Sequence, residues 1–268
     1  MDPTPTDGEI DDTLDALART LADIGLEVRA ALGHVGGAAD RRVVRTEGGD
    51  DVFGVDERAD AVILDALDRR CGRWPGHVVM EGYDDPVPVA GGGPWVYLVD
   101  PVDGTRPYLA GKRSAWVLLG AGRGAVTLED LEVGAAVELP TPRAVLAREA
   151  WARVGGPAHS LDRDLRTGTA TEVVLVPDGN LDHAFVTVAR FGPGSHGPIG
   201  TWADHVLRGL TVFDDLHPCS GGLLMGVAGG SDAAVLDPRP LLHPGGMAAH
   251  PYDPVSYTHL TLPTSDLV

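Results

Sequence analysis

An apolar run near residue 100 ends in two aspartates, a glycine and a threonine, in the order Val99-Asp100-Pro101-Val102-Asp103-Gly104-Thr105. The apolar residues 95–99 predict a short buried strand, and Pro101 cannot extend its hydrogen-bonded ladder. Two carboxylates three residues apart on a turn can converge on one point, and with the carbonyl of Val102 they offer the oxygen ligands that Mg²⁺ prefers. The same spacing also fits an Asx-turn, in which both aspartates accept hydrogen bonds from backbone amides.

The end of this stretch is suited to binding an anion. Gly104 permits a tight turn or a close approach of the backbone to a ligand. If a helix begins here, the amides of Gly104 and Thr105 can bind a phosphate group, and Pro107 is compatible with an early helical position.

The sequence Asp-Pro-Val-Asp-Gly-Thr after an apolar strand resembles the signature of the inositol monophosphatase family. These proteins are Mg²⁺-dependent, often lithium-sensitive phosphatases, in a superfamily that includes fructose-1,6-bisphosphatase. The resemblance implies an α+β fold, a layered α-β-α-β-α sandwich, here with its C-terminal elements missing. It also implies a homodimer that hydrolyses a small phosphorylated metabolite.

The resemblance extends to further acids. The apolar run 78–80 ends in Glu81, where the family has a metal-binding glutamate, although Gly82 replaces the usual second glutamate. The implied ligands of two Mg²⁺ ions are Glu81, Asp100, the Val102 carbonyl, Asp103 and Asp253.

A helical apolar pattern follows Asp56, which fits a helix N-cap. In the family, an aspartate at this location helps to hold a third ion with the residue matching Glu81 and to orient the attacking water. The implied catalytic residues are Thr105, Asp56 and Glu81, with the Thr105 hydroxyl placed to orient the water.

A small-residue turn at 219–222 leads into an apolar segment, and such helix starts bind anions. The resemblance implies that Ser220, Gly221 and Gly222 contact substrate there. Asp237 is a further candidate for the alcohol part, or belongs to a plain turn with Pro238. Inositol phosphates, fructose bisphosphate, histidinol phosphate and 3′-phosphonucleotides all stay open as substrates, as does a catalytically silent metal-binding relative.

The last family motif is matched by His250-Pro251-Tyr252-Asp253, with tyrosine in place of the usual tryptophan. Asp253 is thus a metal ligand by resemblance, or a loop aspartate. The residues 255–260 are also the translation of GTC TCT TAT ACA CAT CT, which matches a transposon end used as a sequencing adapter. We predict one phosphatase domain over residues 1–254, with lobes at about 1–140 and 141–254, the second incomplete. Residues 255–268 are predicted to be non-native read-through; a short edge strand or a tail is the alternative.

Composition narrows the function classes. The chain of 268 residues has a net charge of −18 and 43% hydrophobic residues, which fits a globular protein and argues against a general nucleic-acid-binding surface. There is no apolar run of membrane-spanning length and no signal-peptide pattern, so we expect a cytoplasmic protein without membrane contacts. Cys71 and Cys219 show no metal or redox spacing and are predicted to be buried.

The elements that must position these residues can be read coarsely. Apolar residues at helical spacing predict a first helix over 10–32, ended by Gly33, and a charged loop to about residue 51. The other expected elements are a helix from residue 56, strands ending at 81 and 100 around an exposed loop 84–94, antiparallel strands 113–121 and 133–139, a hairpin loop at 120–124, strands 171–176 and 183–188, and a helix 202–210. The segment 144–154 is ambiguous.

Overall fold

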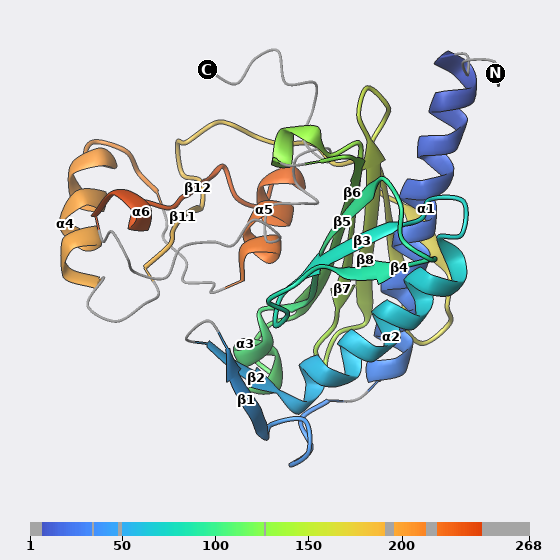
Figure 1. The fold of residues 1–268 in the computed structure, drawn as a ribbon. Helices are drawn as coiled ribbons and strands as arrows, with labels where there is room; N and C mark the ends of the chain where they lie inside the picture. Colours follow the sequence, from blue (N-terminus) through green and yellow to red (C-terminus); the bar gives the residue numbers. More distant parts are fainter. Residues whose placement is uncertain are drawn as a thin grey trace.

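The computed structural model describes residues 7–33, 35–47, 50–125, 127–190, 196–212 and 219–242 (Figure 1). Its centre is an eight-stranded sheet in the order β10-β9-β8-β7-β6-β5-β3-β4. Neighbouring strands are antiparallel except β3 and β5, which run parallel. The strands are β3 (Gly76–Met80), β4 (Val87–Val89), β5 (Trp95–Asp103), β6 (Ala115–Arg123), β7 (Val133–Leu139), β8 (Leu146–Arg153), β9 (His159–Asp164) and β10 (Ala170–Glu172).

Helices and a second small sheet stack on the two faces of this sheet (Figure 1). The long helices α1 (Asp7–Leu32) and α2 (Gly54–Arg70) cover one face. On the other face lies α5 (Ser220–Ala228), followed by the parallel pair β11 (Val186–Val188) and β12 (Ala234–Leu236). The outer layer is α4 (His196–Val206) with α6 (Arg239–Leu242). The predicted α-β-α-β-α sandwich is confirmed.

The first helix forms for the predicted reason. Its apolar stripe, from Leu14 to Leu32, is buried against the sheet, and each fully buried leucine or isoleucine there contributes about 2 kcal/mol. The helix ends at Leu32, and Gly33 follows with a φ of +52°. A Cβ on Gly25 would lie 2.6 Å from Cγ2 of Val137, so glycine lets α1 lie directly on β7.

Several shorter elements differ from the sequence-based expectations. The expected loop before residue 51 contains the hairpin β1 (Val43–Glu47) and β2 (Asp50–Phe53). The expected exposed loop 84–94 contains β4, whose Val89 is buried. Strand β6 continues to Arg123, so the hairpin turn predicted at 120–124 begins only at Gly124, which has a φ of +67°. The ambiguous segment 144–154 contains β8, and β9 was not predicted. These segments are strands because they pair with neighbouring strands, whereas their own runs of apolar and polar residues are too short to predict this.

Three elements in the second half of the chain differ in their bounds from the expectations. The strands predicted at 171–176 and 183–188 shorten to β10 and β11, and the helix predicted at 202–210 is α4, ending at Val206. The large sheet also runs past the predicted lobe boundary near residue 140, because β8, β9 and β10 pair onto it. Within the described part of the chain, no helix has both the length and the apolar character that crossing a membrane requires.

Candidate functional site

Two strands bring acids to one edge of the sheet. In the parallel pair β3–β5, Met80 lies opposite Val99, and the N–H of Glu81 donates to the Val99 carbonyl at 3.3 Å. The next residue of each strand is therefore an acid at the same carboxyl-terminal edge: Glu81 after β3 and Asp100 in β5. Asp100 is buried, with 2% of its surface exposed. The two acids predicted to act together are thus brought to neighbouring strands.

The strand β5 does not stop at the proline. Asp100 pairs with Leu118 and Asp103 with Trp116, so Pro101 and Val102 form an irregularity between two paired positions. A bulge of this kind lets a proline stand inside a strand and redirects the residues that follow. The prediction that the strand ends at Asp100 is therefore wrong by three residues. The N–H of Val102 donates to Oδ1 of Asp100 at 3.0 Å, which is the Asx contact left open by the sequence.

Thr105 begins a short helix, as expected. Gly104 has a φ of +89°, and α3 (Thr105–Leu109) follows it. The Thr105 hydroxyl lies 2.9 Å from Oδ1 of Asp56 and 2.8 Å from the carbonyl oxygen of Val102. Its single proton serves one of these acceptors at a time, and its lone pairs can accept a hydrogen bond from water.

Asp56 is not the N-cap of α2. That position is Phe53, and Asp56 is the third residue of the helix, where its Oδ2 accepts the N–H of Phe53 at 2.8 Å. The side chain therefore has two functions. One oxygen closes the first turn of α2, and the other faces the Thr105 hydroxyl.

Asp103 joins the β5 turn to the start of α5. Its Oδ1 accepts the N–H of Ser220 at 3.2 Å, and its Oδ2 accepts the N–H of Gly221 at 2.5 Å and the thiol of Cys219 at 3.2 Å. A carboxylate at a helix N-terminus interacts favourably with the free amides and the helix dipole. A Cβ on Gly104 would lie 2.9 Å from Sγ of Cys219, so the turn and α5 touch directly. Residues more than 100 positions apart meet here.

Cys219 is buried inside this contact, as predicted for both cysteines. Burial raises the pKa of its thiol, and the nearby carboxylates of Asp103 and Asp100 raise it further. The thiol therefore stays protonated and acts as a hydrogen-bond donor to Asp103.

The remaining predicted residues do not all join this group. Asp237 follows β12, and its carboxylate accepts from Nε and Nη2 of Arg239 at 2.7 and 2.6 Å and from the Arg239 N–H at 3.1 Å. This is the turn that the sequence left as the alternative. Asp253 lies outside the described residues. Gly222 is in the first turn of α5, next to Gly221.

Comparison with known proteins identifies the fold. No protein-family model matches the sequence, and no curated protein matches it. Among solved structures, the extragenic suppressor protein SuhB from Bartonella henselae is similar with a TM-score of 0.65 and 14% identity, over 93% of this chain and 83% of that one. The MJ0109 gene product, an inositol monophosphatase–fructose 1,6-bisphosphatase, is similar with a TM-score of 0.63 and 17% identity, over 90% of this chain and 81% of that one. The inositol monophosphatase from Anabaena is similar with a TM-score of 0.59 and 16% identity, over 93% of this chain and 80% of that one. The chain has the inositol monophosphatase fold.

The donor set within this inositol monophosphatase fold suits a hard cation. Glu81, Asp100, Asp103 and the Val102 carbonyl offer only oxygen atoms, the ligands that Mg²⁺ takes. However, the described residues include no group of three histidines, cysteines, aspartates or glutamates arranged to hold a metal ion. The chemistry of the donors therefore fits Mg²⁺, while both carboxylate oxygens of Asp103 face α5 in this arrangement.

One charged residue near the site was not anticipated. Arg45 on β1 donates from Nη2 to the carbonyl of Gly82 at 3.0 Å, and its guanidinium lies 3.7 Å from Glu57 and 3.9 Å from Asp60. It places a positive charge beside the residue that follows Glu81. No pattern in the sequence indicated this contact, because Arg45 lies in a segment predicted to be a loop.

Proposed function

We propose that this protein hydrolyses a small phosphate monoester with the help of Mg²⁺. The observation that supports this is the register of β3 and β5, which brings Glu81 and Asp100 to the same edge of the sheet, together with the Thr105–Asp56 hydrogen bond at the start of α3. The fold agrees with it, since two of the similar structures are inositol monophosphatases. The chemistry is the release of inorganic phosphate and an alcohol by water.

The proposed ligands of Mg²⁺ are Glu81, Asp100, the Val102 carbonyl and Asp103, together with Asp253. At such a site Mg²⁺ supplies a Lewis acid that neutralises phosphate charge and lowers the pKa of water. This matters for a protein of net charge −18, whose field otherwise repels an anionic substrate.

The chain's own residues would position the reacting groups. Donation from the Thr105 hydroxyl to Oδ1 of Asp56 leaves the Thr105 oxygen free to accept a hydrogen bond from the attacking water. The amides of Gly104 and Thr105 are proposed to hold phosphate oxygens, and Ser220, Gly221 and Gly222 to face the alcohol. Asp103 links the two halves, because each of its oxygens can serve either the amides of α5 or a cation.

A catalytically silent metal-binding relative is the second candidate. Gly82, which stands in place of the second acid, favours this candidate. The two candidates differ in turnover and not in fold.

Phosphate release from a panel of monoesters separates them. We expect release with millimolar Mg²⁺ and none with EDTA, and restoration when Mg²⁺ is returned. Mg²⁺ binding by calorimetry without release from any ester would support the silent relative. The expected homodimer and cytoplasmic location stay predictions, and light scattering tests the first of them.

A further inference from the structure

A row of paired residues crosses the large sheet from the candidate site towards β9. Asp103 on β5 lies opposite Trp116 on β6, and Trp116 lies opposite Glu138 on β7. The N–H of Arg148 on β8 donates to Oε2 of Glu138 at 2.8 Å, and Arg148 lies opposite Asp162 on β9. Because directly paired residues project to the same face of a sheet, this row continues the face on which Asp103 meets α5.

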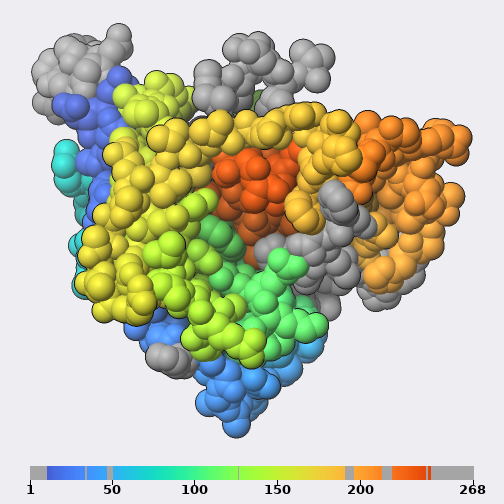
Figure 2. Space-filling view, turned by 180° about the vertical axis from the view of Figure 1, so that it is seen from behind, coloured from blue at the N-terminus to red at the C-terminus, as the bar shows by residue number. Residues whose placement is uncertain are grey.

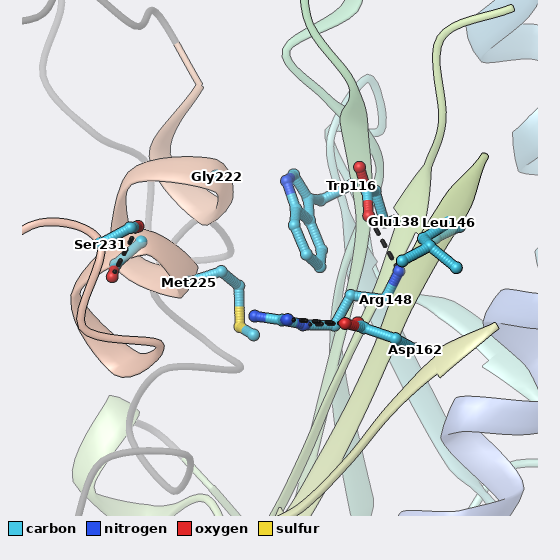
Figure 3. Close-up of a pocket in the computed structure, with 10 residues that line it drawn as sticks. Trp116, Glu138, Leu146, Arg148, Asp162, Gly222, Met225 and Ser231 are labelled. Atoms are coloured by element: carbon cyan, nitrogen blue, oxygen red, sulfur yellow. Dashed lines mark hydrogen bonds and ion pairs between the residues drawn. The ribbon is translucent and has the colours of Figure 1, made fainter. Parts of the chain in front are cut away.

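A cavity of about 310 Å³ lies between this row and α5 (Figure 3). The sheet contributes Trp116, Glu138, Arg148 and Asp162, while α5 contributes Met225 and Gly222, whose neighbour Gly221 donates to Asp103. In the view from behind, α5 lies recessed between the segments around it (Figure 2). Gly222, which the proposed function sets against the alcohol part of the ester, thus also lines this cavity.

The polar row is unusual for this face. The neighbouring residues are apolar and buried, among them Leu118, Ala136 and Ala150. A charged side chain next to apolar, buried neighbours costs free energy unless it forms an ion pair or binds a ligand of opposite charge. From the other face of the sheet, Arg29 on α1 donates to the backbone carbonyls of Glu138 and Arg148, each at 2.6 Å. The fold thus fixes the backbone of both residues.

The charges in the cavity do not cancel. The Arg148 guanidinium forms a bidentate ion pair with Asp162, in which Nε donates to Oδ1 at 2.8 Å and Nη2 donates to Oδ2 at 3.0 Å. Asp162 therefore balances the charge of Arg148. Glu138 uses Oε2 for the Arg148 amide, and it stands beside the indole ring of Trp116 (Figure 3). Two carboxylates thus oppose one guanidinium. A carboxylate beside an aromatic face binds an organic cation through an ion pair and a cation–π contact.

We infer that this cavity is the subsite for the alcohol part of the substrate, and that this alcohol carries a protonated amine. The substrate class is then a phosphate monoester of an amino alcohol, with the ammonium group between Glu138 and Trp116. Hydrolysis adds water across the phosphorus–oxygen bond and gives inorganic phosphate and the amino alcohol, whose ammonium group is unchanged. The inference rests on the proposed phosphatase function for the reaction, but the binding of the amine does not.

Binding of 2-aminoethanol to the metal-free full chain tests the subsite directly. The readout is the indole N–H signal of Trp116 in an NMR titration, assigned by its loss in Trp116→Phe, with ethylene glycol as the neutral comparison. We expect the amine to bind about tenfold more tightly than the diol. Glu138→Gln keeps an acceptor for the Arg148 amide and should remove this preference.

Glu132, the residue just before β7, provides a matched control. Glu132 accepts the N–H of Arg123 at 2.8 Å in the same way but does not line the cavity, so Glu132→Gln should keep the preference for the amine. Equal binding of amine and diol to the wild type, or the same loss in both variants, would overturn the inference.

Kinetics separate this inference from the proposed function. With Mg²⁺, the ratio of kcat/KM for phosphoethanolamine to that for 2-hydroxyethyl phosphate should be about ten in the wild type and near one in Glu138→Gln. Amine binding without hydrolysis of either ester would refute the phosphatase and leave the amine subsite standing. Hydrolysis of both esters at equal efficiency, with no amine binding, would refute the subsite and support the phosphatase.

Discussion

The Thr105 hydroxyl lies 2.9 Å from the carboxylate of Asp56, although 49 positions separate the two residues. The contact joins the start of α3 to the start of α2, and the Thr105 hydroxyl also lies 2.8 Å from the carbonyl oxygen of Val102 in β5. When the hydroxyl donates its proton to this carboxylate, its lone pairs are available to accept a hydrogen bond from water. This geometry is the part of the site that most directly suggests activation of water.

Loss of the Thr105 hydroxyl should slow turnover without unfolding the protein. Thr105→Val keeps the side-chain shape but cannot orient water, and we expect kcat to fall by about 10²–10⁴. Thr105→Ser retains the hydroxyl and should keep most of the activity. Steady-state kinetics with saturating Mg²⁺ measure both, and a Thr105→Val variant with wild-type kcat would exclude Thr105 from catalysis.

Gly104 should be more sensitive to alanine than another glycine with positive φ. Gly104 has a φ of +89°, and an added Cβ would lie 2.9 Å from Cys219, whereas Gly111 has a φ of +66° and open space around its Cβ. Gly111→Ala should cost about 1 kcal/mol from backbone strain alone. Gly104→Ala should cost about 1–3 kcal/mol more from overpacking. Urea unfolding measures both, and equal losses would contradict the close contact between the turn and α5.

The buried Arg29 should contribute strongly to stability. It lies 3.7 Å from the fully buried Glu149 and donates to two strand carbonyls, so Arg29→Met leaves three acceptors without this partner. We expect a loss of about 3 kcal/mol in the free energy of unfolding. The control is Arg69→Met, which removes exposed ion pairs to Glu27 and Asp65 and should cost much less stability, because solvent screens exposed pairs. If the two variants lose the same stability, the Arg29 contacts are not as strong as their burial indicates.

Both thiols should be unreactive in the folded protein. Burial raises the pKa of Cys71 from 9.0 to about 11 and also raises that of Cys219. Since the thiolate is the reactive form, a disulfide reagent at pH 8 should label neither cysteine until urea unfolds the chain. Labelling of Cys219 in the folded state would show that the start of α5 opens.

Stability should also decrease at high pH for the same reason. The folded-state pKa of Cys71 lies above its unfolded value, so the unfolded chain loses a proton first as the pH rises. The contribution is complete below about pH 9 and is lost as the pH rises towards 11. The measurement is urea unfolding of the wild type and Cys71→Ala between pH 8 and pH 11. A wild-type curve parallel to that of the variant would contradict this shift.

The layered fold could be predicted from the sequence, and so could the turn at Gly104 with a helix starting at Thr105. Residues 100–105 are adjacent in the chain, and their turn depends on Pro101 and Gly104, so local chemistry determines much of it. The first helix was also predictable, because its apolar stripe repeats over many turns.

The rest depends on which strands pair and in which register. Nothing local in the chain places Trp116, Glu138, Arg148 and Asp162 in one row, because a shift of one residue in any strand would move them to the other face. The hydrogen bond from the Gly221 N–H of α5 to Asp103 likewise joins segments more than 100 residues apart. Arg45 was missed because its position depends on the β1–β2 hairpin.

The central claim is that Asp100 holds the cation that makes this chain a phosphatase. The most direct measurement is Mg²⁺-dependent phosphate release by the wild type and by Asp100→Asn, with circular dichroism showing that both are folded. The claim predicts that the wild type releases phosphate, and that the folded variant loses both turnover and Mg²⁺ binding. A folded Asp100→Asn variant that turns over like the wild type would contradict it.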